Sequence, residues 1–477
     1  MRVVQESPHP PTPSPVRGRG GTRQVYGPLS RARERGGAQR RGEGSPRKLL
    51  LLLLFAGLLI RIALIPWGAF GYDVDGMSEW TRQLHAAPLA EFYAAEMMVP
   101  PDHLPGDLWV LLGLGWAARL VAPGTDFNGD GYMMALKAVA VVADLLVGML
   151  LHFIARGFVG VRRALLVTAA FVLNPAAIFL SAVWGQWDSV SMALALAALL
   201  LTLRGQVGWA LPVLAIATLI KPQLILLAPL YVVYAVRRKR PDDLAGVRAW
   251  WRGAARTLPT VVGGGVASLV VVVLICLPFD VGLPGMATRW TLLERLQFAA
   301  ERYPLTTYNA YNLWTLPIGR GEPPADSIEA LLGFSAAGVG LVLLLLAYAG
   351  ALAGAAFLPR AELALLWATL ATTLAIFLLP TRVHERYLFP ALVFMALLWG
   401  VVERRRWAGI GLVGLSATMF ANLYLVFAFW KPAIYPEALH TSLTVRAIAL
   451  VNLGILAAVL LIGLIGVIDA SSAVRRR

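Results

Sequence analysis

Apolar runs of about 20 residues recur along this chain from Lys48 almost to the C-terminus. A run of that length forms a helix that can cross a hydrocarbon core about 30 Å thick. Inside lipid the backbone must satisfy its own hydrogen bonds, which an α-helix does within one segment. Only 14% of the 477 residues are charged, whereas a soluble domain is about one-quarter charged. The sequence therefore predicts an all-α, polytopic membrane protein.

Residues 1–46 have a different composition from the rest of the chain. They are rich in Pro, Gly and Arg and contain few large aliphatic side chains, so they cannot bury a core and are expected to be disordered. Their apolar run starts too late for a signal peptide. We expect a basic cytoplasmic tail over 1–46 and a single transmembrane domain over 47–477. The lone Cys276 excludes an internal disulfide.

The net charge of +15 indicates topology rather than nucleic-acid binding, because basic loops of membrane proteins stay in the cytoplasm. The basic segments are the N-terminal tail, Arg162–Arg163, Arg237–Arg240, Arg404–Arg406 and Arg475–Arg477. The remaining loops are mixed or acidic and are placed outside: 67–131, 183–188, 279–326, 380–386 and 430–444.

For two segments, the number of membrane crossings must be decided before the topology can be assigned. Residues 207–236 are predicted to form two short helices broken at Lys221-Pro222, since one long helix would place Arg237–Arg240 outside. Residues 107–121 are predicted to be a re-entrant or interfacial helix, because a run of about 15 residues is short for a span. The prediction is about twelve spans with both ends cytoplasmic: 48–66, 132–155, 164–182, 188–203, 207–220, 222–236, 255–278, 327–350, 361–379, 387–403, 407–429 and 445–468.

This topology collects the unusual polar residues on the outer face. Ionisable groups in or beside spans are expensive and are functional candidates. The candidates are Asp73, Asp75 and Glu79; Trp184, Gln186 and Asp188; Lys221 and Gln223; Tyr308, Asn309, Tyr311, Asn312 and Trp314; and Arg382, His384, Glu385 and Arg386.

Each group also has a structural interpretation. Asp73 or Asp75 could cap a helix, and WGQWD (184–188) could belong to an interfacial aromatic belt. Lys221 could extend toward the lipid headgroups. HER (384–386) could be an ion-paired turn, and YNAYNLW (308–314) could pack as a loop. Their convergence on one face favours function, whereas Asp144, inside the second span, could be buried and paired.

These residue types suit glycosyl transfer at a lipid boundary. A carboxylate can take a proton from a hydroxyl nucleophile, and Lys, Arg and His together can hold a phosphate. Trp, Tyr, Asn and Gln suit the faces and hydroxyls of sugars. No Walker loop, GxGxxG or HExxH is present, so nucleotide hydrolysis and zinc proteolysis lack support.

The same segments resemble the GT-C superfamily of polyprenyl-phosphate-sugar-dependent glycosyltransferases, and most of all its bacterial group similar to the eukaryotic GPI mannosyltransferases. The resemblance rests on GYDVDGMSEW (71–80), LAEFY (89–93), SAVWGQWDS (181–189), LIKPQ (219–223), YNAYNLW (308–314) and PTRVHERYLFP (380–390). It covers about residues 48 to 430. One departure is Asp102-His103, where relatives often show a tyrosine-proline pair and an aliphatic residue; it concerns the acceptor side.

The resemblance implies a GT-C-like fold with interfacial helices in the outer loops, and transfer of a hexose, most of all mannose, with inversion. The donor would be a polyprenyl-phosphate sugar and the acceptor an extracytoplasmic glycan, lipid or protein. It places the catalytic base at Asp73, with Asp75 as the alternative. Lys221, Arg382, His384 and Arg386 would bind the donor phosphate. The residues expected to bind sugar or acceptor are Trp184, Gln186, Asp188, Tyr308, Asn309, Asn312, Trp314 and Glu385.

Several points stay open at the level of sequence. No cofactor is indicated, although two loop carboxylates such as Asp73 and Asp75 could share a divalent cation. The protein is expected in the inner (plasma) membrane, with the site facing outward. The main rival is a polytopic transporter or lipid-linked-sugar flippase, which would usually keep polar groups near the midplane. An O-antigen-ligase-like enzyme with a diphosphate donor and a non-catalytic subunit of an envelope glycan complex are further alternatives.

Overall fold

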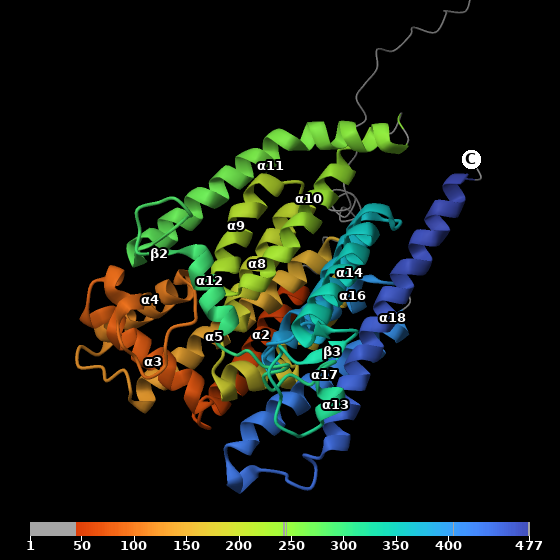
Figure 1. Cartoon of the computed structure of the whole chain (residues 1–477). Coiled ribbons are helices and arrows are strands. Elements are labelled where there is room, and N and C mark those ends of the chain that lie inside the picture. The colour runs from red at the N-terminus through yellow and green to blue at the C-terminus, as the bar shows by residue number, and fades with distance from the viewer. Residues whose placement is uncertain (1–43, 242–243, 245, 404, 476–477) are drawn as a thin grey trace, which may run out of the picture.

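The computed structural model describes residues 44–241, 244, 246–403 and 405–475, and over this part the protein is a bundle of helices (Figure 1). The first half contains α2 (Gly44–Leu64), α3 (Gly71–Ala86), η2 (Leu89–Ala94), α4 (Pro105–Val121), α5 (Asp130–Arg156), α6 (Val161–Val172), α7 (Pro175–Ile178), the π-helical turn η3 (Phe179–Trp184), α8 (Asp188–Leu203) and α9 (Val207–Ile220). The second half contains η4 (Pro222–Leu226), α10 (Leu227–Arg238), α11 (Gly246–Cys276), η5 (Leu277–Phe279), α12 (Leu292–Glu301), α13 (Thr315–Ile318), α14 (Ala336–Phe357), α15 (Ala361–Leu378), η6 (Glu385–Leu388), α16 (Phe389–Val401), α17 (Arg405–Phe429), η7 (Pro432–Ile434) and α18 (Ser442–Arg475).

The strands are few and short. β1 (Val281–Gly282) pairs in parallel with β2 (Trp290–Thr291), and β3 (Glu329–Leu331) pairs antiparallel with β4 (Phe334–Ser335). The predicted all-α class is confirmed.

Six described helices are long and apolar enough to cross a membrane: α5, α11 with η5, α14, α15, α17 and α18. The pair formed by α6 and α7–η3, bent by 47°, makes a seventh if it is one span, and α8 and α9 are shorter apolar helices. The chain is therefore a multi-pass membrane protein. Of the most apolar stretch of α15, 83% is buried inside the bundle, against 11% for α11, so α15 lies in the core and α11 presents its surface outward.

The predicted break within residues 207–236 is confirmed. α9 ends at Ile220, Lys221 adopts an extended conformation, and a 3-10 turn starting at Pro222 leads into α10. Proline lacks the amide that would continue the hydrogen bonds of α9, so the break follows from Lys221-Pro222. Residues 105–121 form the single helix α4, which leaves Trp116, Leu120 and Val121 exposed.

Other boundaries differ from the sequence prediction. The segment 67–131, which was predicted to lie outside, is largely helical, since it contains α3, η2 and α4. The helix predicted from residue 327 begins at Ala336, because residues 329–335 form the β3–β4 hairpin. The span predicted over 387–403 becomes α16, whose 13 residues are almost all buried. The tail predicted to be disordered lies outside the described residues, except that α2 begins at Gly44.

A buried ion pair joins four elements in the middle of the bundle. Arg61 of α2 donates through Nε to Asp144 Oδ2 of α5 at 2.8 Å, and both side chains are fully buried. Ser181 of η3 donates to the same carboxylate at 2.7 Å, and Ser189 of α8 bonds its other oxygen. Removing one partner of such a pair leaves an uncompensated buried charge, so Asp144 fixes both ends of the segment 181–189.

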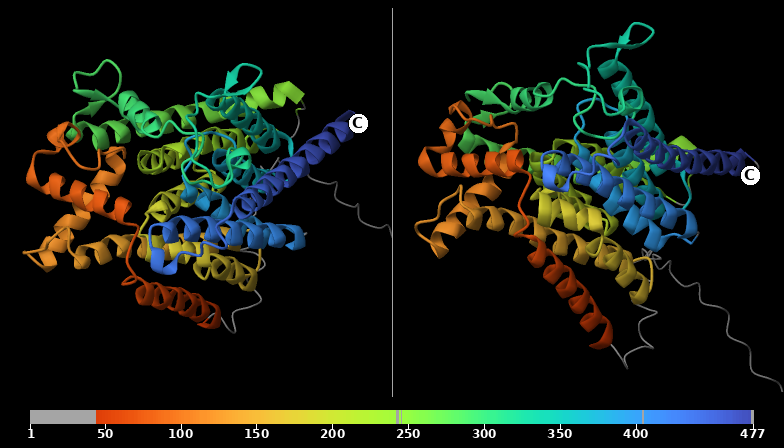
Figure 2. Two further views of the ribbon diagram at one scale, coloured as in Figure 1. Left: turned by 60° about the horizontal axis from the view of Figure 1, so that its bottom comes forward. Right: turned by 90° about the horizontal axis from the view of Figure 1, so that it is seen from below.

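The bundle has two distinct ends. At one end, Arg238 at the end of α10 donates to the carbonyl of Leu203 at the end of α8. At the other end, Lys221, which precedes α10, lies 3.9 Å from Asp188 at the start of α8. A 16-residue helix such as α8 is about 24 Å long. Figure 2 shows α3 and α4 gathered toward one end and the C-terminal end of α18 at the other.

Candidate functional site

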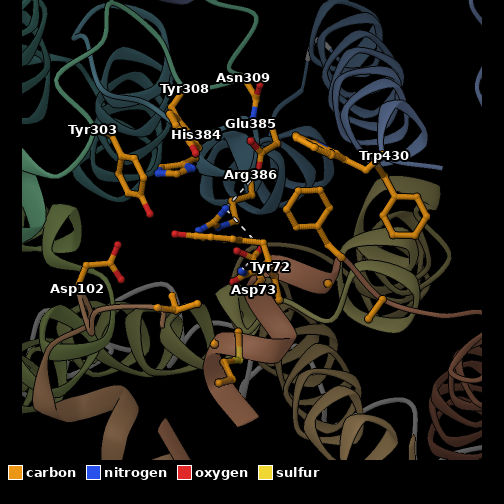
Figure 3. A pocket seen from close by; sticks show the side chains of 18 of the residues that line it. Tyr72, Asp73, Asp102, Tyr303, Tyr308, Asn309, His384, Glu385, Arg386 and Trp430 are labelled. Atoms are coloured by element: carbon orange, nitrogen blue, oxygen red, sulfur yellow. Dashed lines mark hydrogen bonds and ion pairs between the residues drawn. The ribbon is translucent and has the colours of Figure 1, made fainter. Parts of the chain in front are cut away.

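A cavity of about 630 Å³ lies at the end of the bundle where α3 begins. Segments far apart in sequence line it: Ala69–Asp73, Gly76, Met77, Trp80, Val99, Asp102, His103, Gln186, Tyr303, Tyr308, Asn309, His384–Arg386, Phe427, Trp430 and Lys431. Its volume falls in the range of small-molecule sites, about 300–1,000 Å³. Figure 3 shows Asp73 near the middle, with Asp102 and Trp430 on opposite sides of it.

Asp73 lies in the first turn of α3, whose N-cap is Phe70. The carboxylate does not cap the helix. Trp184 donates to its Oδ2 through Nε1 at 2.8 Å, and Gln186 does so through Nε2 at 2.6 Å. No described residue donates a hydrogen bond to Oδ1 of Asp73, which leaves that oxygen available to a ligand in the cavity.

The helix separates the two candidate carboxylates. Asp73 and Asp75 were predicted to lie on a loop, where they could share one ion. This placement is wrong, because both lie on α3. Residues two apart on a helix do not face each other. Asp75 is exposed and does not line the cavity, whereas Asp73 does. Within the described part of the chain, no group of three or more His, Cys, Asp and Glu side chains could hold a metal ion.

The π-helical turn explains how Trp184 and Gln186 both reach Asp73. Residues 179–184 wind more widely than an α-helix, and Gly185 then turns the chain with a φ of +95°. Both Gly185 and Gln186 donate their amides to the carbonyl of Leu180. Phe70 stacks on the Trp184 ring at 4.4 Å. The start of α3 is thus fixed against the WGQW segment.

Arg386 connects Asp73 to Glu385. Its Nη1 lies 3.1 Å from Glu385 Oε1 and 3.8 Å from Asp73 Oδ2. Arg386 Nε is buried and has no hydrogen-bond partner among the described residues. The guanidinium is therefore held in place while part of its donor capacity stays unused. Burial raises the pKa of Glu385 to about 7, opposed by Arg386 and reinforced by the charge of Asp73.

His384 lies beside this group, between aromatic rings. The ring of Tyr308 lies 4.7 Å away and that of Tyr303 5.1 Å away. Burial, together with the positive charges of Arg386 and Lys221, holds the pKa of His384 well below its usual value. The imidazole is then neutral near pH 7 and acts through hydrogen bonding rather than through charge.

The other predicted residues divide into two groups. Tyr308 and Asn309 line the cavity. Asn312 and Trp314 instead bond backbone carbonyls of Phe377 and Leu379 and so tie the loop to α15.

The predicted cations Lys221 and Arg382 do not line the cavity. Lys221 is buried beside Asp188, with 3.9 Å between Nζ and Oδ1. Arg382 pairs with Asp326 at 2.6 Å and also donates to the carbonyl of Ala300. Both cations therefore hold neighbouring segments together.

Sequence reasoning missed several lining residues. Tyr72, Tyr303, Trp430 and Lys431 belong to the cavity, and Lys431 Nζ lies 4.6 Å above the Phe427 ring. Lys431 makes no ion pair with the described residues. Its position at the start of the segment 430–444, which was predicted to lie outside, was the only signal in the sequence, because the cavity forms only when that segment meets α3.

Comparisons with known proteins add no relationship to this picture: no protein-family model matches the chain, and no curated protein matches its sequence.

Proposed function

We propose that this protein is an integral-membrane, inverting glycosyltransferase. It moves a hexose, mannose in the first place, from a polyprenyl-phosphate donor to an extracytoplasmic acceptor. The observation that carries the proposal is Asp73: one oxygen is fixed by Trp184 and Gln186, the other receives no hydrogen bond from the described residues, and Arg386 lies 3.8 Å away in the same cavity. A positioned base beside a buried cation is what direct displacement of a phosphate from a sugar requires.

In the proposed step, the sugar moves from phosphate to acceptor by a single displacement. The oxygen of an acceptor hydroxyl forms a bond to the anomeric carbon of the sugar, on the face opposite the phosphate. The bond from that carbon to the phosphate oxygen breaks, and its electron pair leaves with polyprenyl phosphate. The hydroxyl proton passes to Asp73 Oδ1, which has no other described donor. One displacement inverts the anomeric carbon.

Three groups support charge development on the departing phosphate. Arg386 supplies charge through its unused guanidinium donors, and neutral His384 can donate a hydrogen bond. Lys431 supplies a cation that no described carboxylate neutralises. Lys221 and Arg382, paired with Asp188 and Asp326, support the site from outside the cavity in this proposal.

The membrane arrangement is part of the proposal. About twelve crossings, with the shorter helices α8, α9, α10 and α16 counted, would keep both chain ends in the cytoplasm of a plasma membrane. The cavity would then face outward. This arrangement is supported by the basic end of α10, which lies at the opposite end of α8 from Asp188.

Purified protein supplied with polyprenyl-phosphate mannose and a membrane extract as acceptor tests the proposal. The wild type should release polyprenyl phosphate and transfer the sugar. Asp73→Asn keeps the shape of the side chain and removes the base, and should lower turnover by about 10²–10⁴-fold. Asp75→Asn, exposed on the same helix, is the matched control and should change turnover little.

Two results would contradict the proposal. Normal turnover by a folded Asp73→Asn protein would remove the proposed base. Donor that crosses the bilayer of a proteoliposome chemically unchanged, with no polyprenyl phosphate released, would favour a flippase instead.

A further inference from the structure

The cavity wall on the far side of Asp73 from Trp430 carries a second polar cluster, which the transfer step above does not use (Figure 3). It consists of Asp102 and His103, which line the cavity, and Asp107, which is buried behind them. We call these three residues the acceptor cluster.

His103 is fixed from three directions. Its Nδ1 lies 2.6 Å from Asp107 Oδ2, the Trp80 ring meets the imidazole edge to face at 4.9 Å, and Tyr93 donates to its backbone carbonyl at 2.8 Å. An ionised carboxylate only accepts hydrogen bonds, so when the ring carries a single proton that proton is on Nδ1. This leaves Nε2 as an acceptor, and no described residue donates to it.

Asp102 is fixed in a similar way. Its Oδ2 lies 3.6 Å from Arg302 Nε, and Arg302 donates to Tyr72 OH at 3.1 Å across the rim of the cavity. The other oxygen, Oδ1, lies 4.0 Å from His103 Nε2. Two acceptors at this separation are too far apart to share a proton directly, but adjacent hydroxyl groups of one molecule can donate to both.

Resting on the proposed function, we propose that the acceptor cluster binds two neighbouring hydroxyls of the acceptor substrate. The acceptor is then a sugar or another polyol with vicinal hydroxyls, not a protein side chain with a single hydroxyl. His103 and Asp102 contact the acceptor, and Asp107 is a positioning residue that sets the tautomer and angle of His103. A purely structural alternative exists, because Asp107 lies in the first turn of α4 and could simply stabilise that helix.

Acceptor binding and stabilisation of α4 can be told apart by measurement, because a polyol acceptor needs a binding site and water does not. Full-length protein with polyprenyl-phosphate mannose is assayed in two ways, for release of polyprenyl phosphate to water and for transfer to methyl α-D-mannopyranoside. A single-hydroxyl acceptor, N-acetylserine amide, gives the comparison. His103→Ala should lower transfer to the mannoside about ten-fold, mainly through a higher KM for it, and leave release to water within two-fold. Asp107→Asn should have a smaller effect of the same kind.

The control is His85→Gln, since His85 lies on α3 outside the cavity. A parallel fall in both reactions for His103→Ala would make the cluster structural and overturn the inference. So would equal transfer to the mannoside and to the serine derivative by the wild type.

Binding gives the inference a test of its own. Saturation-transfer NMR of the mannoside with wild-type protein should show contact, and His103→Ala should lose it. A wild type that binds the mannoside yet never releases polyprenyl phosphate would count against the proposed transfer alone. Absence of binding by the wild type would count against the acceptor cluster.

Discussion

Arg386 faces two carboxylates and a cavity, so its availability to a ligand depends on the charge of its neighbours. Asp73 lies 3.8 Å from Nη1 and Glu385 lies 3.1 Å from it. Glu385 is buried, and its pKa of about 7 makes it the neighbour whose charge changes near neutral pH. Below that pH the carboxyl of Glu385 is neutral, and Arg386 is paired with Asp73 alone. Above it, the Glu385 carboxylate would compete with the proposed donor phosphate for the same guanidinium.

The first prediction concerns Glu385. The KM for donor should rise as pH increases through about 7, and Glu385→Gln, which stays neutral, should keep the low KM to higher pH. The same raised pKa should make the free energy of unfolding depend on pH. The native carboxyl keeps its proton up to about pH 7, whereas in the unfolded chain its pKa is 4.5. The wild type should therefore lose stability as pH rises across that window. Glu385→Gln should lack that slope. Identical pH profiles for the wild type and Glu385→Gln would contradict this, and Glu437→Gln, at an exposed position, is the control.

The second prediction concerns Lys431, which lines the cavity and makes no ion pair with a carboxylate of the described residues. Farnesyl phosphate should bind purified protein more tightly than either farnesol or inorganic phosphate, because both the lipid chain and the charge contribute. Lys431→Gln should weaken binding of farnesyl phosphate by about ten-fold or more, the usual effect of losing a hydrogen bond to a charged group. Lys431→Arg should largely retain it. Lys239→Gln, at the other end of the bundle, is the matched control; equal affinities for all four proteins would exclude Lys431 from phosphate binding.

Among elements, the segment from Phe179 to Ser189 determines the geometry around Asp73. Ser181 and Ser189 bond Asp144, and Trp184 and Gln186 between them hold Asp73. The sequence indicated that this segment matters, because WGQWD combines aromatic and polar groups beside a span. It could not indicate the π-helical turn, since no residue in FLSAVW enforces that winding.

The third prediction uses Gly185, whose φ is +95°. A Cβ there would lie 3.1 Å from Val74 Cγ2 and 3.4 Å from Lys137 Cγ, so Gly185→Ala should push α3 away from Trp184. We expect turnover to fall by about 10–100-fold, since small misplacements of reacting groups are expensive. Gly205→Ala has a similar φ of +81° but open space around the added Cβ, and it should lose only about 1–2 kcal/mol of stability with near-normal turnover. Comparable losses of turnover in the two variants would assign the effect to backbone strain alone.

α3 shows why element type can be misread. GYDVDGMSEW contains two glycines and three acidic residues and follows a span directly, so it was treated as a loop. The helix forms because Val74, Met77 and Trp80, three residues apart, are buried on one face against neighbouring segments. Tertiary packing outweighed the weak local preference. The Lys221-Pro222 break, in contrast, was predictable because proline acts through local geometry alone.

For the whole molecule, hydropathy located the long helices, because each needs only its own sequence to satisfy its backbone in lipid. The cavity was harder to predict. Asp73, Gln186, His384 and Arg386 were found through residue chemistry, but Tyr72, Tyr303 and Lys431 come from loops that meet only when the bundle is assembled. Lys221 and Arg382 were predicted to bind the donor phosphate. Each instead lies beside a carboxylate, Asp188 or Asp326, that is distant in sequence.

The last prediction tests the direction of the bundle in the membrane. Two exposed residues lie at the end of the bundle that holds the cavity: Ala287, in the loop between β1 and β2, and Ala438, after η7. Gln206, between α8 and α9, is exposed at the opposite end, where Arg238 bonds Leu203. Basic residues near Gln206 should keep that end in the cytoplasm. Single cysteines at 287 and 438 should therefore react with an impermeant maleimide added to intact cells, and a cysteine at 206 only after permeabilisation. The native Cys276 is 1% exposed and should give little background. Labelling at 206 from outside, with protection at 287 and 438, would invert the bundle and place the cavity in the cytoplasm, where a donor on the outer leaflet could not reach Asp73.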